Sequence, residues 1–284
     1  MPIDVDRVAG ADLPATRHSW DVDDVILYHL GVGAGDPPTD PGELAYVYEG
    51  SLKVLPTFAT VPMFASMMGI LNLEGLDVNP AMILHGEQSV RLHRPIPAAA
   101  SVVNHGRVTE VYDKGKGAVA VVEISTVTES GEELFTNTAA IYVRGEGGFG
   151  GDPGPEPAHR PPQREPDAEF SSTTLPQQAL LYRLSGDKNP LHADPAFAAF
   201  GGFDRPILHG LCTYGVVCKA VVDHLLDGDV TAVAGFDARF SGVVFPGETI
   251  VTRAWRADGA ILVEARTSER DQTVLANAAV LLTG

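Results

Sequence analysis

The chain has 284 residues, of which 44% are hydrophobic and 20% are charged, and its formal net charge is −17. This composition is typical of a globular protein that can bury a core without disulfides or metal ions. The excess of acidic side chains argues against a broad surface for the phosphate backbone of nucleic acid.

No stretch approaches the ~20 apolar residues that a membrane span needs. The first residues have neither the basic part nor the apolar part of a secretory signal. We therefore expect a cytoplasmic protein without a membrane partner. The two cysteines, Cys212 and Cys218, lie six apart in one apolar run without the spacing of a zinc site, so we expect two buried free thiols and no metal.

The first half of the chain predicts one long helix followed by strands. Residues 58–73 are apolar without strict alternation, which favours a helix. Residues 85–97 are typical of a strand that runs into a proline turn. Residues 118–128 and 134–143 predict two further strands, joined by a turn at 130–131.

A segment rich in glycine and proline separates the two halves. Residues 145–169 contain six glycines and six prolines, so neither a helix nor a strand can continue through them. We interpret this segment as a linker between an N-terminal domain at residues 1–144 and a C-terminal domain at residues 170–284.

The second half repeats the order of the first at a nearly constant offset. Its predicted elements are a helix at 207–226, a strand with a proline turn at 236–247, and paired strands at 260–267 and 273–282. Each repeat is one long helix plus an antiparallel sheet that can wrap around it. We therefore predict an α+β double hot-dog fold, with two tandem hot-dog units whose sheets lie side by side.

One loop of the second half carries groups suited to acid–base chemistry. Asp187, Asn189 and His192 lie within six residues, between Gly186 and two prolines. Pro190 prevents a regular helix and pushes Asn189 toward an extended backbone, so a rigid loop can point Asp187 and His192 into one space. A carboxylate and an imidazole that share a water can deprotonate it, which is worth roughly 10²–10⁴-fold in rate. The alternative is an ordinary turn, because Asp, Asn and Pro are common turn residues.

Gly210, near the start of the second long helix, is a candidate oxyanion donor. A glycine lets a ligand approach the backbone closely. An N–H at the positive end of the helix dipole can hold an oxygen that gains negative charge. One such donor stabilises a transition state by roughly 3–4 kcal/mol. The alternative is a glycine that only allows close helix packing.

These residues resemble a known family. The segments 182–195 and 203–214 closely resemble the (R)-specific 2-enoyl-CoA hydratases (hydratase 2, MaoC-like), above all the hydratase part of peroxisomal multifunctional enzyme type 2 and its actinobacterial relatives. The likeness covers nearly the whole chain. The motifs of the first half and the linker that fit the same family lie at 27–34, 48–50, 55–58, 84–88, 113–115 and 147–151.

The resemblance implies a role for each group of the second-half loop. Asp187 and His192 would hold the water that adds across the 2,3 double bond of an enoyl-CoA, giving the (3R)-3-hydroxyacyl-CoA. The N–H of Gly210 would bind the thioester oxygen, and Asn189 would support the loop. The reaction would need no metal and no cofactor, since the CoA belongs to the substrate.

The resemblance also implies residues that bind the acyl-CoA thioester. They are His85, Gly86, Lys114 and Phe240, with Glu49 on the acyl side in a less defined role. Arg239 and Lys188 are further candidates for the CoA phosphates, because local cations must offset the acidic charge of the chain. Four methionines, which either line an adaptable pocket or belong to the ordinary core, are Met63, Met67, Met68 and Met82.

Two other functions compete with the hydratase of fatty-acid or steroid side-chain β-oxidation. A hot-dog thioesterase would use a carboxylate on the long helix, but residues 207–222 contain none. A non-catalytic acyl-CoA-binding subunit would have no use for Asp187 and His192. A homodimer is one possible assembly.

Overall fold

Ten strands form one antiparallel sheet in the computed structural model, which describes residues 3–79 and 82–284. Along the sheet the order is β1-β3-β4-β5-β2-β7-β10-β9-β8-β6. The strands of the N-terminal half are β1 (Thr16–Trp20), β2 (Ile83–Leu92), β3 (Ala100–Asp113), β4 (Gly117–Thr128) and β5 (Glu133–Arg144). Those of the C-terminal half are β6 (Ala168–Thr173), β7 (Val233–Phe240), β8 (Thr249–Ala257), β9 (Ala260–Thr267) and β10 (Thr273–Leu282).

The two halves have the same strand order, read outward from the seam between β2 and β7. Each half places its second strand at the seam and its first strand at an outer edge of the sheet. This mirrored order is what a tandem repeat of one hot-dog unit produces, so the predicted double hot-dog fold is confirmed. The coil after β5 crosses from one half to the other and ends where β6 begins at residue 168.

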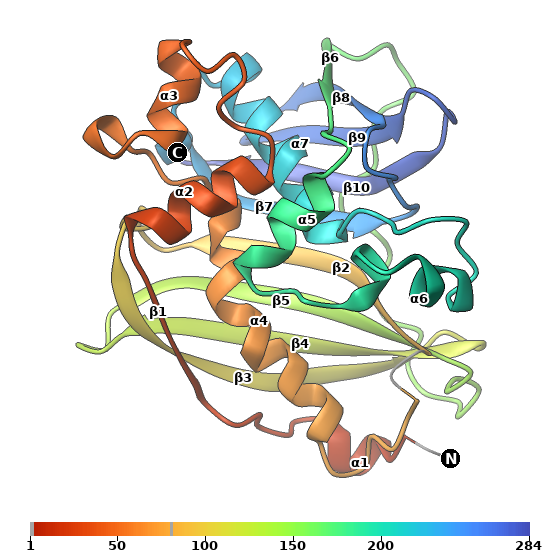
Figure 1. Ribbon diagram of the computed structural model, residues 1–284. Coiled ribbons are helices and arrows are strands. Elements are labelled where there is room, and N and C mark those ends of the chain that lie inside the picture. Colours follow the sequence, from red (N-terminus) through yellow and green to blue (C-terminus); the bar gives the residue numbers. More distant parts are fainter. Residues whose placement is uncertain (1–2, 80–81) are drawn as a thin grey trace.

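The helices gather on one face of this sheet (Figure 1). They are α1 (Val5–Val8), α2 (Val22–Gly31), α3 (Pro41–Val47), α4 (Thr60–Met68), α5 (Gln178–Tyr182), α6 (Pro195–Phe200) and α7 (Gly210–Leu225). Short 3-10 turns are η1 (Glu49–Ser51), η2 (Pro56–Ala59), η3 (Gly69–Asn72), η5 (Arg183–Ser185), η6 (Pro190–His192) and η7 (Val230–Ala232). Helix α4 packs on the N-terminal strands, and α7 packs on the C-terminal strands. No helix in the described part of the chain is long and apolar enough to cross a membrane.

The two central helices differ in regularity. The second matches its prediction, and every residue of α7 from Leu211 to Val222 is buried, as expected for a helix that a sheet wraps. The prediction of one continuous helix at residues 58–73 is wrong, because η2, α4 and η3 follow one another over residues 56–72. Pro56 opens the first 3-10 turn and Gly69 the second. Both residue types disfavour a continuous α-helix.

A single hydrophobic cluster joins both halves. In the N-terminal half the ring of Phe58 lies 5.6 Å from Trp20 and 5.5 Å from Tyr28, both edge-on. In the C-terminal half Tyr214 stacks on Phe236 at 4.3 Å. The two cysteines are buried free thiols, as predicted. Of the four methionines, Met63 and Met67 belong to the core, whereas Met68 and Met82 are each 39% exposed, so the core interpretation is wrong for these two.

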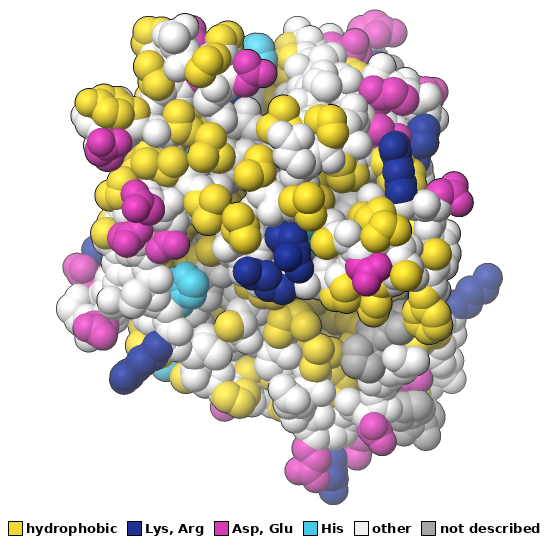
Figure 2. Space-filling view, viewed as in Figure 1, with side chains coloured by type: hydrophobic (Ala, Val, Ile, Leu, Met, Phe, Trp, Pro, Cys, Tyr) yellow, Lys and Arg dark blue, Asp and Glu magenta, His cyan; other side chains and the backbone are white. Residues whose placement is uncertain are grey.

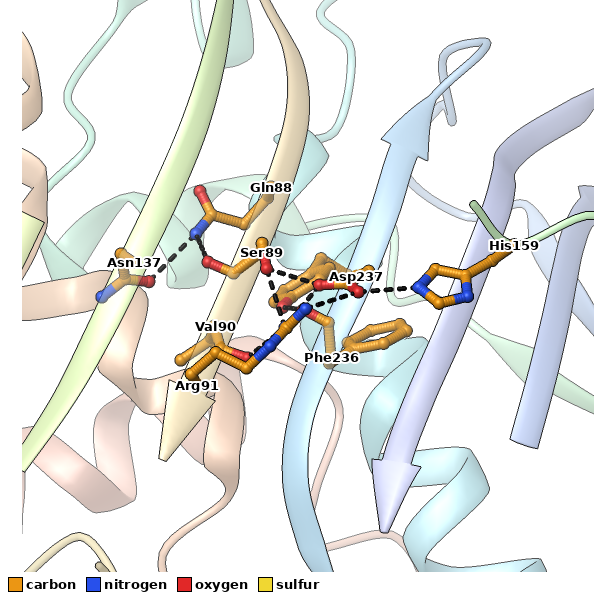
Figure 3. A network of polar contacts seen from close by, with 9 residues as sticks. Gln88, Ser89, Val90, Arg91, Asn137, His159, Phe236 and Asp237 are labelled. Carbon is orange, nitrogen blue, oxygen red and sulfur yellow. Dashed lines mark hydrogen bonds and ion pairs between the residues drawn. The ribbon is translucent and has the colours of Figure 1, made fainter. Parts of the chain in front are cut away.

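A polar network holds the seam between the halves together (Figure 3). Asp237 of β7 pairs with Arg91 of β2 through two contacts of 2.5 and 2.8 Å, and it also accepts a hydrogen bond from Ser89. His159 of the linker lies 2.8 Å from the same carboxylate. Burial raises the pKa of Asp237, but the hydrogen bonds from Arg91 and Ser89 outweigh it and hold the pKa below its ordinary value. One carboxylate thus ties together both halves and the linker.

Candidate active site

The loop between η5 and α6 presents the two predicted acid–base groups. Gly186 ends η5 with φ 130°, a backbone conformation that favours glycine. The Asp187 carboxylate then accepts a hydrogen bond from the N–H of Asn189 at 3.0 Å. The side chain of Asn189 accepts one from the N–H of Leu191 at 3.0 Å and so caps η6. These local contacts give the stretch from Asp187 to His192 a defined shape.

His192 is buried at the end of η6, and one contact decides which of its nitrogens carries the proton. Its Nδ1 lies 2.9 Å from the carbonyl oxygen of Ile207. Because a carbonyl only accepts, Nδ1–H is the donor, and the lone pair of the neutral ring is on Nε2. Burial lowers the pKa of His192, while the nearby Asp187 raises it by a smaller amount. The ring is therefore neutral at pH 7 and can accept a proton at Nε2.

A second histidine, which sequence reasoning did not name as a site residue, completes this cluster. His209 is 1% exposed, and its ring stacks on that of His192 with 3.7 Å between the centroids. Its Nε2 lies 3.2 Å from the carbonyl oxygen of Asp187. Burial and the neighbouring His192 lower the pKa of His209 to about 2. The available signal was its place directly before the glycine that opens the long helix.

Gly210, Phe240 and His85 come together from three elements beside this cluster. Gly210 is the first residue of α7, so its N–H has no partner within the helix. A Cβ atom on Gly210 would lie 3.2 Å from the ring of Phe240, which leaves little room for a side chain. Phe240 in turn meets the ring of His85 edge-on, with 5.1 Å between centroids.

His85 adds a buried ring beside Phe240. Its Nε2 is buried without a hydrogen-bond partner in the described part of the chain. Burial lowers the pKa of His85 to about 4, so the ring is neutral. Gly86 follows at an irregularity in the pairing of β2 with β5. An unpaired buried nitrogen next to Phe240 is suited to contact a substrate.

Two predicted substrate residues, Lys114 and Glu49, are exposed. Lys114 is exposed in the turn between β3 and β4, where its ammonium contacts the carbonyl oxygen of Pro153. Glu49 is exposed in η1, after α3. Helix α3 is anchored to the second half of α7 by Glu43, which lies 2.6 Å from Lys219. Among the described residues no hydrogen bond or ion pair joins Lys114 or Glu49 to the loop.

The surface above the loop is hollowed and carries basic side chains. Figure 2 shows Lys and Arg side chains over the segment between α5 and α6, beside a hollow with hydrophobic side chains along it. The basic residues of this segment are Arg183 and Lys188. Lys188 is exposed, as is Arg239 on β7. An anionic ligand that enters over the segment between α5 and α6 would meet the positive charge of its basic residues.

Three residues have the types that could hold a metal ion. Ligand atoms of Asp187, His192 and His209 lie within 4.8 Å of one another. However, the two imidazole rings are stacked at 29°, so their in-plane lone pairs do not converge on one point. One nitrogen of each ring also faces a backbone carbonyl. The cluster fits proton transfer better than metal coordination.

Comparison with known proteins places the chain in a family. Residues 18–145 match the MFE-2 hydratase 2 N-terminal domain, and residues 157–278 match the MaoC like domain. The chain is 47% identical over 277 residues to the enoyl-CoA hydratase ChsH3 of Mycobacterium tuberculosis, which covers 97% of each chain. The chain belongs to the MaoC-like hydratase 2 family.

Two further proteins are similar to the chain over nearly its whole length. The peroxisomal enoyl-CoA hydratase 2 of Arabidopsis thaliana is 41% identical, over 95% of this chain and 93% of that protein. A MaoC-like dehydratase of Phytophthora capsici, known as a crystal structure, superposes with a TM-score of 0.86 at 32% identity, covering 99% of both chains. Both halves of the present chain are therefore part of the family likeness.

Proposed function

We propose that this member of the hydratase 2 family reversibly hydrates a trans-2-enoyl-CoA to the (3R)-3-hydroxyacyl-CoA, in the β-oxidation of fatty acids or steroid side chains. The observation that carries the proposal is the neutral His192, with its lone pair on Nε2, beside Asp187 on one shaped loop. The relatives named as enoyl-CoA hydratases support it.

The chemistry assigns a part to each group. A water held by Asp187 and His192 gives up a proton to this pair, and its oxygen forms a bond to C3 of the substrate. The electron pair of the double bond moves onto the thioester oxygen, where the N–H of Gly210 stabilises the charge. C2 then takes a proton from the Asp187–His192 pair, so the pair returns to its starting state.

The N-terminal half supplies no second set of these groups. Its matching stretch reads Gly-Val-Gly-Ala-Gly-Asp at residues 31–36. We infer that this half forms a wall for the acyl chain and contributes His85 to the site. A cytoplasmic location and a homodimer remain predictions from the sequence.

A thioesterase is the alternative within the same fold, and α7 disfavours it. The carboxylate of this helix is Asp223, near its C-terminal end. Asp223 accepts a hydrogen bond from Tyr46 at 2.6 Å and pairs with Lys219 at 2.8 Å. A carboxylate engaged in this way is not available to attack or activate water at the start of the helix.

A chiral hydration assay tests the proposal. Purified protein with a short and a long trans-2-enoyl-CoA should consume the conjugated enoyl absorbance and give (3R) product. The substitution Asp187→Asn should keep substrate binding and lower turnover at least about 100-fold, and His192→Ala should do the same, because each removes one member of the acid–base pair. Near-normal turnover of Asp187→Asn would contradict the assignment. Release of free CoA without hydration would point to the thioesterase.

A further inference from the structure

We propose that His209 is a positioning residue that fixes the loop of Asp187 and the ring of His192 relative to Gly210. The inference rests on the proposed hydratase function, since it assigns a role to a residue of the same site. It starts from the place of His209 in the chain, directly before Gly210 at the N-terminal end of α7.

The ring of His209 contacts both acid–base residues of the loop. One face stacks on His192, and Tyr182 packs against the ring with 5.0 Å between centroids. Its Nε2 faces the carbonyl oxygen of Asp187 at 3.2 Å. The backbone of His209 continues directly into Gly210. One buried residue thus contacts the base and the carboxylate residue through its ring and continues into the oxyanion donor through its backbone.

His209 is suited to hold these groups but not to exchange protons with the substrate. A backbone carbonyl only accepts, so the Nε2–H of His209 is the donor to Asp187. The ring is neutral, and its Nδ1 is buried without a hydrogen-bond partner among the described residues. With Nε2–H held by a carbonyl and Nδ1 buried, neither nitrogen of His209 is open to a substrate, so the ring contributes through geometry.

The loop needs such an anchor because it has little regular structure. Residues 186–189 form neither a helix nor a strand. Two successive carbonyls of this stretch accept hydrogen bonds from side chains. The carbonyl of Asp187 accepts from His209, and that of Lys188 accepts from Arg183 at 3.1 Å. Of these two donors, only His209 adjoins α7, as its N-cap residue, and so ties the loop to the helix that presents Gly210.

Two substitutions separate the parts of this role. His209→Phe keeps a flat ring against His192 but removes the donor to Asp187. His209→Gln keeps an N–H donor of similar reach but removes the ring. Because a misplacement of about 1 Å can cost about 100-fold in rate, we expect His209→Phe to lower kcat at least about tenfold with KM changed less than about twofold. His209→Gln should recover part of the loss.

The matched control is His224→Phe, the same change at the other end of α7, where His224 is exposed and stacks on Phe170. It should leave kcat unchanged. All kcat values are referred to folded protein, measured by near-ultraviolet circular dichroism and urea unfolding. A merely structural role would lower the folded fraction and leave kcat per folded molecule at the wild-type value, and that result would overturn the proposal.

A second readout does not depend on activity. The ring nitrogen resonances of His192 report its environment and protonation, and they should shift in His209→Phe but not in His224→Phe. If the wild-type protein fails to hydrate any enoyl-CoA, the proposed function fails, but this shift still tests the positioning role. Unchanged His192 resonances in a folded His209→Phe protein would overturn it.

Discussion

Buried histidines in this protein differ by what their second nitrogen contacts. His29 donates from Nδ1 to the carbonyl of Tyr46 at 2.6 Å and accepts at Nε2 from the N–H of Leu55 at 3.1 Å, so both nitrogens are used. His192 also donates from Nδ1 to a carbonyl, but no described group hydrogen-bonds to its Nε2. The same residue type is therefore a structural bridge in one place and an available base in the other.

The pH dependence of the reaction follows from the burial of His192. Burial lowers the pKa of this ring below 6.5 more than Asp187 raises it. The neutral form, which is the one that accepts a proton, thus persists below pH 6.5. We expect kcat/KM for an enoyl-CoA to fall in acid with a midpoint below pH 6.5. Initial rates between pH 5 and 8 at constant ionic strength check this, with circular dichroism at each pH to confirm the fold. A midpoint at or above 6.5 would contradict it.

The sequence predicts the shape of the loop better than it predicts the contacts that other segments make with the loop. Gly186 and Pro190 delimit a short non-helical stretch, and this local chemistry is enough to place Asp187 near His192. Such reasoning does not find His209, because its role depends on stacking against His192, and no rule of sequence spacing predicts that contact. Motif likeness likewise named Glu49 on the acyl side, and the structure places it in η1, after α3.

At the scale of elements, the seam between β2 and β7 depends on the pairing of Arg91 with Asp237. The side chain of Asp237 is 17% exposed, so its charge needs the partner, while Arg91 is 43% exposed and can be solvated alone. Removing the arginine should therefore cost more than removing the acid.

We expect Arg91→Met to lower the free energy of unfolding by about 2 kcal/mol at pH 7, between the values for exposed and buried pairs. Asp237→Asn should cost less. The double variant should be more stable than Arg91→Met alone, because it leaves no unpaired buried charge. Urea unfolding of the four proteins completes the double-mutant cycle. Equal losses in the two single variants would show that burial of Asp237 is unimportant.

Two of the strands that the sequence does not predict, β3 and β6, lack the regular apolar pattern of a strand. In β3 the inward-facing Asn104 is fully buried and bonds to the carbonyl of Pro62 at 2.8 Å and to Thr126 at 2.7 Å. A polar residue on the buried face breaks the apolar alternation by which strands are recognised. The edge strand β6 is six residues long with alternating exposure and little apolar sequence. The strand β9 near the C-terminus is predicted because its alternation is intact.

At the scale of the whole molecule, four neutral histidines make the fold sensitive to acid. Burial lowers the pKa of His29 and His85 to about 4 and that of His209 to about 2, and it also lowers the pKa of His192. Unfolding returns each ring to its ordinary pKa near 6.5. At a pH between the folded and the unfolded pKa of a ring, the unfolded chain binds more protons than the folded chain. The stability is thus fully present above pH 6.5 and is lost as the pH falls below it.

The acidic side chains of the surface change the stability in the opposite direction as the pH falls. As the pH falls toward the isoelectric point of 4.8, the net charge of −17 shrinks and its self-repulsion weakens. These surface charges are screened over about 10 Å at 0.1 M salt, whereas each buried ring contributes up to about 1.4 kcal/mol per pH unit. We therefore expect the buried histidines to determine how the stability changes as the pH falls.

We expect the free energy of unfolding in urea to be nearly constant from pH 8 to 7 and to fall by several kcal/mol by pH 5. His29→Gln isolates the contribution of one histidine to this pH dependence, because His29 lies outside the proposed site and glutamine does not titrate. At pH 7 this variant should be less stable, since it alters two buried hydrogen bonds, but its slope below pH 6.5 should be shallower by up to about 1.4 kcal/mol per pH unit. A stability maximum near pH 4.8 would mean that repulsion between surface carboxylates, and not the protonation of buried rings, controls how this fold responds to acid.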